Sequence, residues 1–369
     1  MHFSLFLTTR GHRPDDDHRV INAMVDHAKQ APRLGFDAVF LPDHHFTGYA
    51  PPSSDSFIFA AYLAAQLPDT WFGFSIQTVP LHNPVRFAER VALLSNLTRG
   101  RLLVGVGSGT TPEESIGFGV DFRETSKVGN ENLEIIERLW AKQPGDDPIE
   151  FDTGHYKGAV VSRISPAPYG DPMRQIMSVA ARPASVERAV KHGQSAFIHN
   201  FAPPAQLFPE VPFDVFKEGY LRYRTALEAA GHSPEVVARA LEWTTATWQY
   251  IHVAPTDEQA NEELDLLLAQ YQGSIDEEFR GNKAAEKILG IDLPKQQNAL
   301  SDEYRRVWCI AGSPDTVAAR LQPYADLGVG NILGGFMGGP LTDERIRLTN
   351  SSLDLFSREV MPRFKQGRA

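Results

Sequence analysis

The chain has very little cysteine and no long hydrophobic run, and we expect no secretory leader in it. Its one cysteine, Cys309, excludes an intrachain disulfide, so the 369 residues must rely on a large hydrophobic core. No apolar run approaches the roughly 20 residues that span a bilayer. Residues 1–11 lack the basic segment and the small-residue cleavage site of a signal peptide. We therefore expect a soluble, cytoplasmic, globular protein.

Positive charge is also scarce. Lysine and arginine number 36 against 46 aspartates and glutamates, which gives a formal net charge of −10. Broad electrostatic binding of nucleic acid requires a basic face, so this balance argues against it. Hydrophobic residues make up 42% of the chain and charged residues 22%. Those proportions are ordinary for a globular protein and exclude disordered and fibrous architectures.

Short apolar runs alternate with longer amphipathic ones along nearly the whole chain. The apolar runs predict strands at residues 3–7, 38–41, 72–79, 101–106, 176–179, 196–198, 248–253, 308–310 and 331–333. The amphipathic stretches predict helices at residues 20–34, 56–67, 84–97, 131–140, 183–191, 213–230, 257–269, 314–327 and 343–360. About eight strand–helix pairs predict an α/β protein with a (β/α)8 TIM barrel.

The length beyond a minimal barrel falls in two places, which predicts insertions at about residues 145–172 and 273–299. The second is polar and rich in glycine, lysine, glutamine and glutamate, so we expect a mobile lid or a partly disordered excursion there. No inter-domain linker and no short repeat is evident. Residues 1–369 are therefore predicted to form one elaborated barrel domain.

Reactive groups of such a barrel belong at the C-terminal ends of its strands. Directly after the second predicted strand come Asp43, His44, His45 and Phe46. A histidine at a strand mouth suits general acid/base catalysis, because its pKa lies near working pH. A structural histidine pair that hydrogen-bonds loop carbonyls is the alternative. Adjacent histidines without a spaced third ligand make a poor metal site, so we expect no metal.

Two further segments carry polar or glycine-rich turns after predicted strands. Residues 105–110 contain three glycines around Ser108, which lets a flat ring or an anion approach the backbone closely. Residues 178–185 cross from a strand to a helix start, where free amides, Ser185 and the charge of Arg182 can hold a phosphate. The alternatives are a rim turn without ligand and a serine that only caps its helix.

Together with the sequence between them, the segments at residues 43–46, 105–110 and 178–185 resemble the bacterial luciferase-like flavin monooxygenases. The resemblance covers nearly the whole chain except the two predicted insertions. It rests on residues 43–47 (Asp-His-His-Phe-Thr), 79–86, 88–89, 95–101, 134–140, 311–314 and 325–329. These motifs are specific for the superfamily and say little about the substrate.

The resemblance implies a usually dimeric barrel that binds reduced FMN, which a separate NAD(P)H:flavin reductase supplies. Molecular oxygen then gives a C4a-peroxyflavin, which inserts one oxygen atom into a small or polycyclic organic substrate. The position that matches the catalytic acid/base is His44. The residues that match the cofactor site are Ser75, Gln77, Gly107, Ser108, Ala181, Arg182 and Ser185. We expect the substrate to contact Phe6, His45 and Phe46.

The sequence differs from that of luciferase itself at positions that match contacts to the FMN phosphate and to the flavin ring. Ser108 replaces an arginine, and Ala181-Arg182 replaces an acidic residue followed by serine, so we expect Arg182 to supply the positive charge. Two other functions remain open: an F420-dependent oxidoreductase of the same superfamily, and a flavin-binding protein without turnover. Hydroxylation, Baeyer–Villiger oxidation and aldehyde oxidation are all compatible with the motifs.

Overall fold

Eight parallel strands close into a barrel in this computed structural model, which describes residues 1–11, 13–46, 51–200, 209–292 and 298–365. In order around the barrel, the strands of this described part are β1 (His2–Phe6), β13 (Asn331–Gly335), β10 (Thr245–Trp248), β9 (Ser195–Ile198), β8 (Ile176–Val179), β5 (Leu102–Gly107), β4 (Trp71–Thr78) and β3 (Ala38–Leu41). The predicted (β/α)8 barrel is confirmed.

The barrel interior is filled by side chains from alternate strand positions, as expected for a packed core. On β3, Phe40 points inward and contacts the ring of Phe197, with 6.1 Å between ring centroids. A Cβ on Gly73 of the neighbouring strand would lie 2.2 Å from the Phe40 ring. Glycine is therefore required there, because the ring occupies the space of a side chain.

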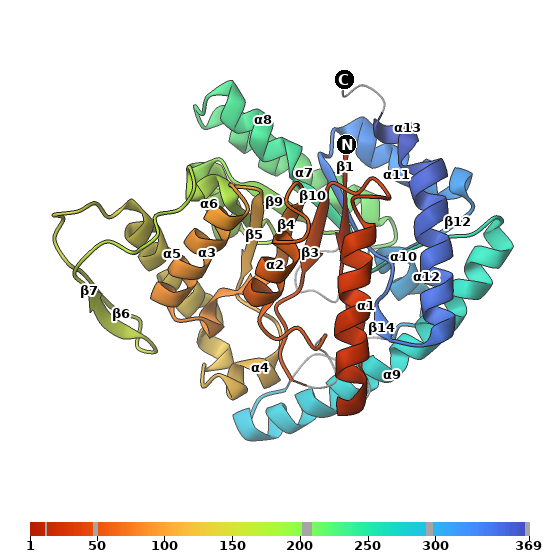
Figure 1. Cartoon of the computed structure of the whole chain (residues 1–369), viewed down its shortest axis with the longest axis horizontal. Helices are drawn as coiled ribbons and strands as arrows, with labels where there is room; N and C mark the ends of the chain where they lie inside the picture. The colour runs from red at the N-terminus through yellow and green to blue at the C-terminus, as the bar shows by residue number, and fades with distance from the viewer. Residues whose placement is uncertain (12, 47–50, 201–208, 293–297, 366–369) are drawn as a thin grey trace.

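Helices surround the barrel, and Figure 1 shows them distributed around its outside. The longer ones are α1 (Asp17–Gln30), α2 (Ser56–Ala64), α3 (Pro84–Leu97), α5 (Thr125–Ala141), α6 (Pro183–His192), α7 (Pro212–Ala229), α8 (Pro234–Glu242), α9 (Asp257–Leu289), α11 (Pro314–Leu327) and α12 (Asp343–Leu355). The shorter ones are α4 (Pro112–Gly117), α10 (Asp302–Trp308), α13 (Pro362–Lys365), four 3₁₀ turns at Pro14–Asp16, Val79–Leu81, Phe122–Glu124 and Pro172–Gln175, and a π-helical turn at Phe356–Val360.

Local signals explain why several predicted helices have the observed bounds. α3 begins with Pro84, and the side chain of Asn83 accepts hydrogen bonds from the first free backbone N–H groups. α6 ends at Gly193, whose φ of 60° is the left-handed conformation that glycine adopts readily. α8 was not predicted, although Pro234 opens it, because only one of its residues, Ala240, is fully buried.

Two strands predicted for the barrel lie outside it. The predicted strand 248–253 is two strands: β10 in the barrel ends at Trp248, and β11 (Tyr250–Val253) pairs with β12 (Cys309–Gly312). The predicted strand at 308–310 thus belongs to this outer two-stranded sheet. An apolar run shows that a strand is buried, but only the tertiary pairing decides which sheet contains it.

Most of the second predicted insertion is a regular helix and not an irregular excursion. α9 continues through Gly273 to Leu289, where Gly290 caps it, so most of residues 273–299 is helical. Residues 293–297 lie outside the described part. A glycine inside a helix costs only about 1 kcal/mol relative to alanine, and buried Ile275 and Ala285 on the far side of Gly273 offset that cost.

The first predicted insertion contains an antiparallel hairpin of β6 (Ile149–Asp152) and β7 (Lys157–Val160). Figure 1 shows this hairpin at the left edge, projecting away from the barrel. Its residues are mostly exposed, in contrast to the barrel strands. No described helix is long and apolar enough to cross a membrane.

The two ends of the barrel differ in what covers them. The N-terminus and α13 lie at the upper end in Figure 1, and the Met1 amine donates to the backbone oxygen of Phe364 at 3.3 Å. α4, part of α9 and the short strand β14 (Gly339–Pro340), which pairs with β2 (Thr9–Arg10), lie at the lower end. The barrel strands finish at this lower end, so it is the face where the candidate site residues belong.

Candidate active site at the barrel mouth

Asp43 is a buried carboxylate at the base of the loop that follows β3. Its side chain accepts hydrogen bonds through Oδ2 from the backbone N–H of Thr78 at 2.8 Å and from Nε2 of His82 at 2.9 Å. Burial alone would raise the pKa of Asp43, but the imidazoles of His82 and His45 outweigh it and hold this pKa well below its usual range. Asp43 therefore ties the ends of two neighbouring strands together as an ion.

His44 pairs with a carboxylate from a different element. Nδ1 of His44 lies 3.0 Å from Oε1 of Glu114, which belongs to α4. The same Oε1 accepts a hydrogen bond from the backbone N–H of His45 at 2.8 Å. The side chain of Glu114 is 2% exposed and that of His44 is 26% exposed. A buried carboxylate thus holds an imidazole whose ring still reaches the surface of the mouth.

His45 occupies a drier position than its neighbour. Its Nε2 lies 3.5 Å from Oδ1 of Asp43. Burial lowers the pKa of His45, but the charges of Asp43 and Glu114 prevail and raise it above its usual value. The ring of Phe118 packs edge-on against His45 with 4.5 Å between centroids, and Phe46 lies beside both. His45 is therefore an imidazole that tends to carry charge next to aromatic rings.

The described residues contain no group of three or more histidine, cysteine, aspartate or glutamate side chains that could hold a metal ion. The carboxylates of Asp43 and Glu114 instead bind imidazole and backbone N–H groups. What the cluster offers chemically is proton transfer at the imidazoles.

Two glycines in the second half of β5 lie where no side chain fits. A Cβ on Gly105 would come within 2.3 Å of the backbone oxygen of Phe74, and a Cβ on Gly107 within 2.5 Å of Cδ1 of Ile76. Both glycines are therefore required by close packing of β4 against β5, whether or not a ligand is bound. Ser108, at the end of the strand, is half-buried.

The two predicted contacts on β4 differ in burial. The register of β4 against β5 shifts between Phe74 and Gln77. Ser75 lies within this irregular stretch and is half-buried, whereas Gln77 is fully buried. Nε2 of Gln77 donates to the hydroxyl of Ser56 on α2 at 2.6 Å. Gln77 thus anchors α2 to the barrel through its Nε2, whereas its buried Oε1 has no hydrogen-bond partner among the described residues.

The predicted phosphate site lies at the N-terminus of α6. Arg182 precedes the helix in an extended conformation, its side chain is exposed and makes no cap hydrogen bond, and its Nη1 lies 3.5 Å from the hydroxyl of Ser126. Ala181 and Ser185 are half-buried on either side of it. Pro183 has no N–H, and the Ser185 N–H donates to the Arg182 backbone oxygen at 3.0 Å. A guanidinium, the Ala184 N–H and the Ser185 hydroxyl therefore form the donor set that an anion would meet here.

Of the remaining predicted contacts, Phe6 ends β1 and belongs to the apolar cluster inside the barrel, where it is 9% exposed. Phe46 is 45% exposed and has a φ of 71°. The structure therefore places Phe6 beneath the mouth and Phe46 at its rim. Thr47, the last residue of the predicted motif, lies outside the described residues.

Sequence reasoning missed three members of this cluster. Glu114 follows a proline at the start of a six-residue helix, a context that resembles an ordinary acidic first turn. His82 lies within a motif that we had assigned only to the family resemblance. Phe118 is one aromatic residue among many in the chain. No local pattern identifies them, because their partners are distant in sequence.

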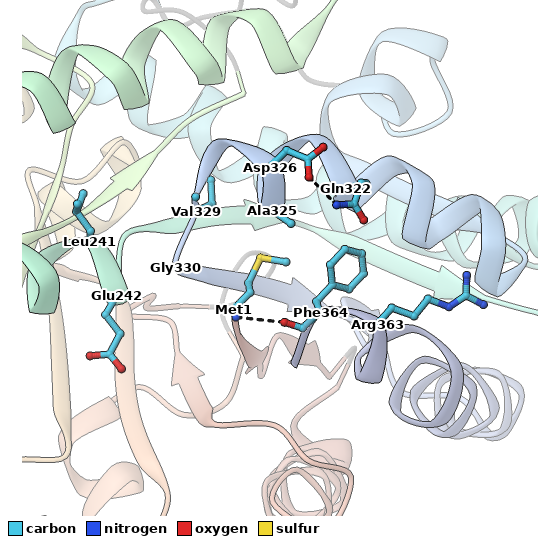
Figure 2. A pocket seen from close by; sticks show the side chains of 11 residues that line it. Met1, Leu241, Glu242, Gln322, Ala325, Asp326, Val329, Gly330, Arg363 and Phe364 are labelled. Atoms are coloured by element: carbon cyan, nitrogen blue, oxygen red, sulfur yellow. Dashed lines mark hydrogen bonds between the residues drawn. The ribbon is translucent and has the colours of Figure 1, made fainter. Parts of the chain in front are cut away.

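A separate pocket of about 450 Å³ opens at the opposite end of the barrel (Figure 2). Its lining includes Met1, Glu242 and Asp326. Their polar groups are already engaged: the Met1 amine with the chain near the C-terminus, Glu242 with His2, and Asp326 with Gln322. This pocket lies at the N-terminal ends of the strands, away from the face where this fold places catalysis.

Two curated relatives align with most of this chain and represent two kinds of enzyme. The 4-hydroxyprotoasukamycin monooxygenase of Streptomyces nodosus subsp. asukaensis is 26% identical over 341 residues, covering 90% of this chain and 84% of the relative. The F420-dependent glucose-6-phosphate dehydrogenase of Amycolatopsis mediterranei is 24% identical over 353 residues, covering 93% and 94%.

A solved structure shares the whole fold. It is a type II Baeyer–Villiger monooxygenase, the oxygenating constituent of 3,6-diketocamphane monooxygenase from Pseudomonas putida, in complex with FMN. It superimposes with a TM-score of 0.69 at 19% identity, covering 100% of this chain and 99% of that one. The sequence model of the luciferase-like monooxygenases matches residues 1–331. The chain therefore belongs to the luciferase-like monooxygenase family.

Proposed function

We propose that this protein is the oxygenating component of a two-component monooxygenase, which uses reduced FMN and molecular oxygen to insert one oxygen atom into a small or polycyclic organic molecule. The observation that carries the proposal is the pair of buried carboxylates, Asp43 and Glu114, that holds the adjacent imidazoles of His44 and His45 at the barrel mouth. Family membership and the monooxygenase among the relatives support oxidoreductase chemistry at this face.

The residues at the mouth fit FMN in their donor set. Arg182, the backbone N–H of Ala184 and the hydroxyl of Ser185 in the first turn of α6 suit one terminal phosphate. We assign the phosphate to Ala181, Arg182 and Ser185, and the ring to Ser75 and the backbone at Gly107–Ser108. Bound reduced FMN would supply the electrons that activate oxygen. Gln77 stays in this set through its buried Oε1, because only its Nε2 is bonded to Ser56.

In this proposal His44 is the proton-transfer group of the site. Its imidazole is partly exposed at the mouth, while its Nδ1 is held by Glu114. His45 and the rings of Phe46 and Phe118 form a wall of aromatic rings, and such a wall keeps bulk water from the reacting atoms. The substrate is assigned to the space above Phe6 and beside these rings.

The proposal requires two protein partners. A separate NAD(P)H:flavin reductase supplies the reduced cofactor, by diffusion or by transient contact. The second partner is another copy of this chain, which we assign to the outer faces of α2 and α3. Four large apolar side chains there are more than a third exposed, namely Ile58, Tyr62, Leu93 and Leu97. Exposed large apolar side chains on two helices that contact each other are typical of an interaction surface.

The function is tested in two steps. Anaerobic titration should give tighter binding of reduced FMN than of reduced FAD, because the site has one phosphate anchor. With a flavin reductase, NADH and ¹⁸O₂, a panel of aldehydes, ketones and polycyclic aromatics should give at least one product that gains a single ¹⁸O by mass spectrometry. Equal or tighter FAD binding would refute the assigned phosphate site. Flavin binding without ¹⁸O in any product would indicate a binding protein.

An F420-dependent oxidoreductase is the second candidate, and the F420-dependent relative that aligns with 93% of this chain favours it. Such an enzyme transfers a hydride and incorporates no oxygen. The same titration with F420 in place of FMN distinguishes the two candidates. Tighter binding of F420 than of reduced FMN, together with F420 reduction by an alcohol or sugar phosphate under anaerobic conditions, would replace the monooxygenase proposal.

A further inference from the structure

We propose that Glu114 is a positioning residue: its carboxylate fixes the orientation and the tautomer of His44, so that Nδ1 carries the proton and Nε2 is the atom that accepts one. This inference rests on the proposed role of His44 in proton transfer. The inference assigns a second residue, Glu114, to the site and names Nε2 of His44 as the atom that accepts the proton. It also gives a function to the short helix α4, which carries Glu114 at the mouth.

The geometry around Glu114 defines the tautomer. Oε1 of Glu114 faces Nδ1 of His44 at 3.0 Å and receives the backbone N–H of His45 at 2.8 Å. An ionised carboxylate can only accept hydrogen bonds, so Nδ1 of His44 must be the donor. The neutral ring then has its acceptor lone pair on Nε2. The backbone contact to His45 fixes the loop, so the imidazole and its support move together.

Burial makes this support rigid. Glu114 is 2% exposed, and a carboxylate taken out of water is costly unless hydrogen bonds compensate it. The two donors from the 44–45 loop provide that compensation, and rotating His44 away would remove one of them. Because Glu114 is out of water, it cannot exchange the His44 hydrogen bond for one to solvent, so the pairing is maintained. A carboxylate exposed to water could make that exchange.

The neighbouring residue provides a matched control. Glu113 is on the same helix, and its carboxylate is directed at α9, where a Cβ on Gly281 would lie 2.3 Å from its Oε2. Burial and the adjacent Glu114 charge raise the pKa of Glu113. The two glutamates thus share helix, charge and nearly the same sequence position, but only Glu114 contacts the histidines.

The test compares Glu114→Gln with Glu113→Gln in the flavin-free protein and in turnover. Ring-nitrogen NMR shifts of ¹⁵N-labelled histidine, assigned with His44→Ala, report the tautomer directly. We expect the wild type and Glu113→Gln to show a protonated Nδ1 on neutral His44, and Glu114→Gln to show a mixture, because an amide can both donate and accept. The kcat should fall roughly 10-fold or more in Glu114→Gln, with KM nearly unchanged.

A second readout does not depend on turnover. The charges that face His45 are Asp43 and Glu114, with Asp55 further away, and His82 lies across Asp43. Removing the Glu114 charge should lower the pKa of His45 in an NMR titration, whereas Glu113→Gln should move it much less. Circular dichroism checks that each variant is folded.

Two results separate this inference from the proposed function. If Glu114→Gln keeps the wild-type tautomer and the wild-type kcat, the positioning role is overturned, even if His44→Ala is inactive. If His44→Ala stays active while Glu114→Gln changes the tautomer and the His45 titration, Glu114 does orient the ring and the assigned role of His44 is wrong. A loss of kcat in both glutamine variants would mean that the helix matters only structurally, which also overturns the inference.

Discussion

The carboxylate of Asp43 accepts a hydrogen bond from Nε2 of His82 at 2.9 Å, and this contact joins the loop after β3 to the turn after β4. The other carboxylate oxygen lies 3.5 Å from the imidazole of His45. Adjacent histidines therefore have different carboxylate partners: His45 faces Asp43, and His44 faces Glu114 from α4. Because each imidazole has its own carboxylate partner, each ring has a fixed orientation. Two neighbouring histidines on a loop without such partners would have no fixed ring orientation.

Replacing His44 tests its proton-transfer role. His44→Ala should lower turnover by ~10²–10⁴-fold, the usual scale for a positioned general acid or base. The affinity for reduced FMN should change far less, because the assigned phosphate contacts are on α6. Steady-state product formation with a reductase, and anaerobic flavin titration, measure the two quantities. Near-wild-type turnover in a folded variant would leave His44 structural and make His45 the next candidate.

Replacing Asp43 tests the buried ion at the base of the site. Asp43→Asn should lower the free energy of unfolding at pH 7 by about 1–3 kcal/mol, because buried donors lose a charged acceptor. The folded pKa of Asp43 is depressed, so its stabilisation is present above the unfolded pKa of ~3.9 and is lost as pH falls below it. Urea unfolding between about pH 6 and pH 3 should show a steeper decline in wild type than in Asp43→Asn.

The control for that experiment is Asp343→Asn. Asp343 forms an exposed ion pair with Arg19 and its side chain is 93% exposed, so it should contribute at most about 1 kcal/mol. If the free energy of unfolding of Asp43→Asn changes with pH in parallel with that of the wild type, the inferred ionisation of Asp43 is contradicted.

Replacing residues of the assigned phosphate site should lower the affinity for reduced FMN, which His44→Ala should leave nearly unchanged. Ser185→Ala should weaken the binding of reduced FMN by about 0.5–2 kcal/mol, the range for losing a hydroxyl at a helix N-terminus. Arg182→Ala should weaken it as well, and that loss should shrink as salt is added because the guanidinium is exposed. Isothermal titration under anaerobic conditions measures both. Unchanged affinity in both variants would remove α6 from the cofactor site.

The apolar patch on α2 and α3 predicts the oligomeric state. The double variant Leu93→Glu/Leu97→Glu should be monomeric at micromolar concentration by light scattering, where the wild type should be a dimer. Each leucine is more than half exposed, so the folded protomer should tolerate the change. Ile288→Glu is the matched control, since Ile288 is 71% exposed on α9. A monomeric wild type would refute the interface outright.

The candidate interface on α3 does not coincide with its main apolar residues. Val85, Phe87, Val91 and Leu94 cover more than one face of the helix, which is more than one stripe of contact with the barrel requires. In the structure Phe87 packs against Phe57 of α2, and Val91 and Leu94 are also buried. α3 is therefore covered on two sides within one protomer, and the candidate interface lies on a third.

The sequence by itself determined the barrel, because alternating apolar and amphipathic runs admit few other arrangements. It also determined the bounds of α3 and α11, where a capping side chain and a first-turn proline mark the start. These signals are local: each depends on residues within one or two helical turns. The position of His44 after the second barrel strand was determined in the same way.

Tertiary structure alone decided the rest. Glu114 meets His44 across 70 positions of sequence, and Gln77 turns toward Ser56 because of a register shift in β4. α9 continues through Gly273 because contacts made elsewhere stabilise its second half. Two groups that are distant in sequence interact only once the fold brings them together, so neither local segment predicts the contact. Packing therefore determines which carboxylate meets each imidazole at the mouth, and so the orientation of the rings.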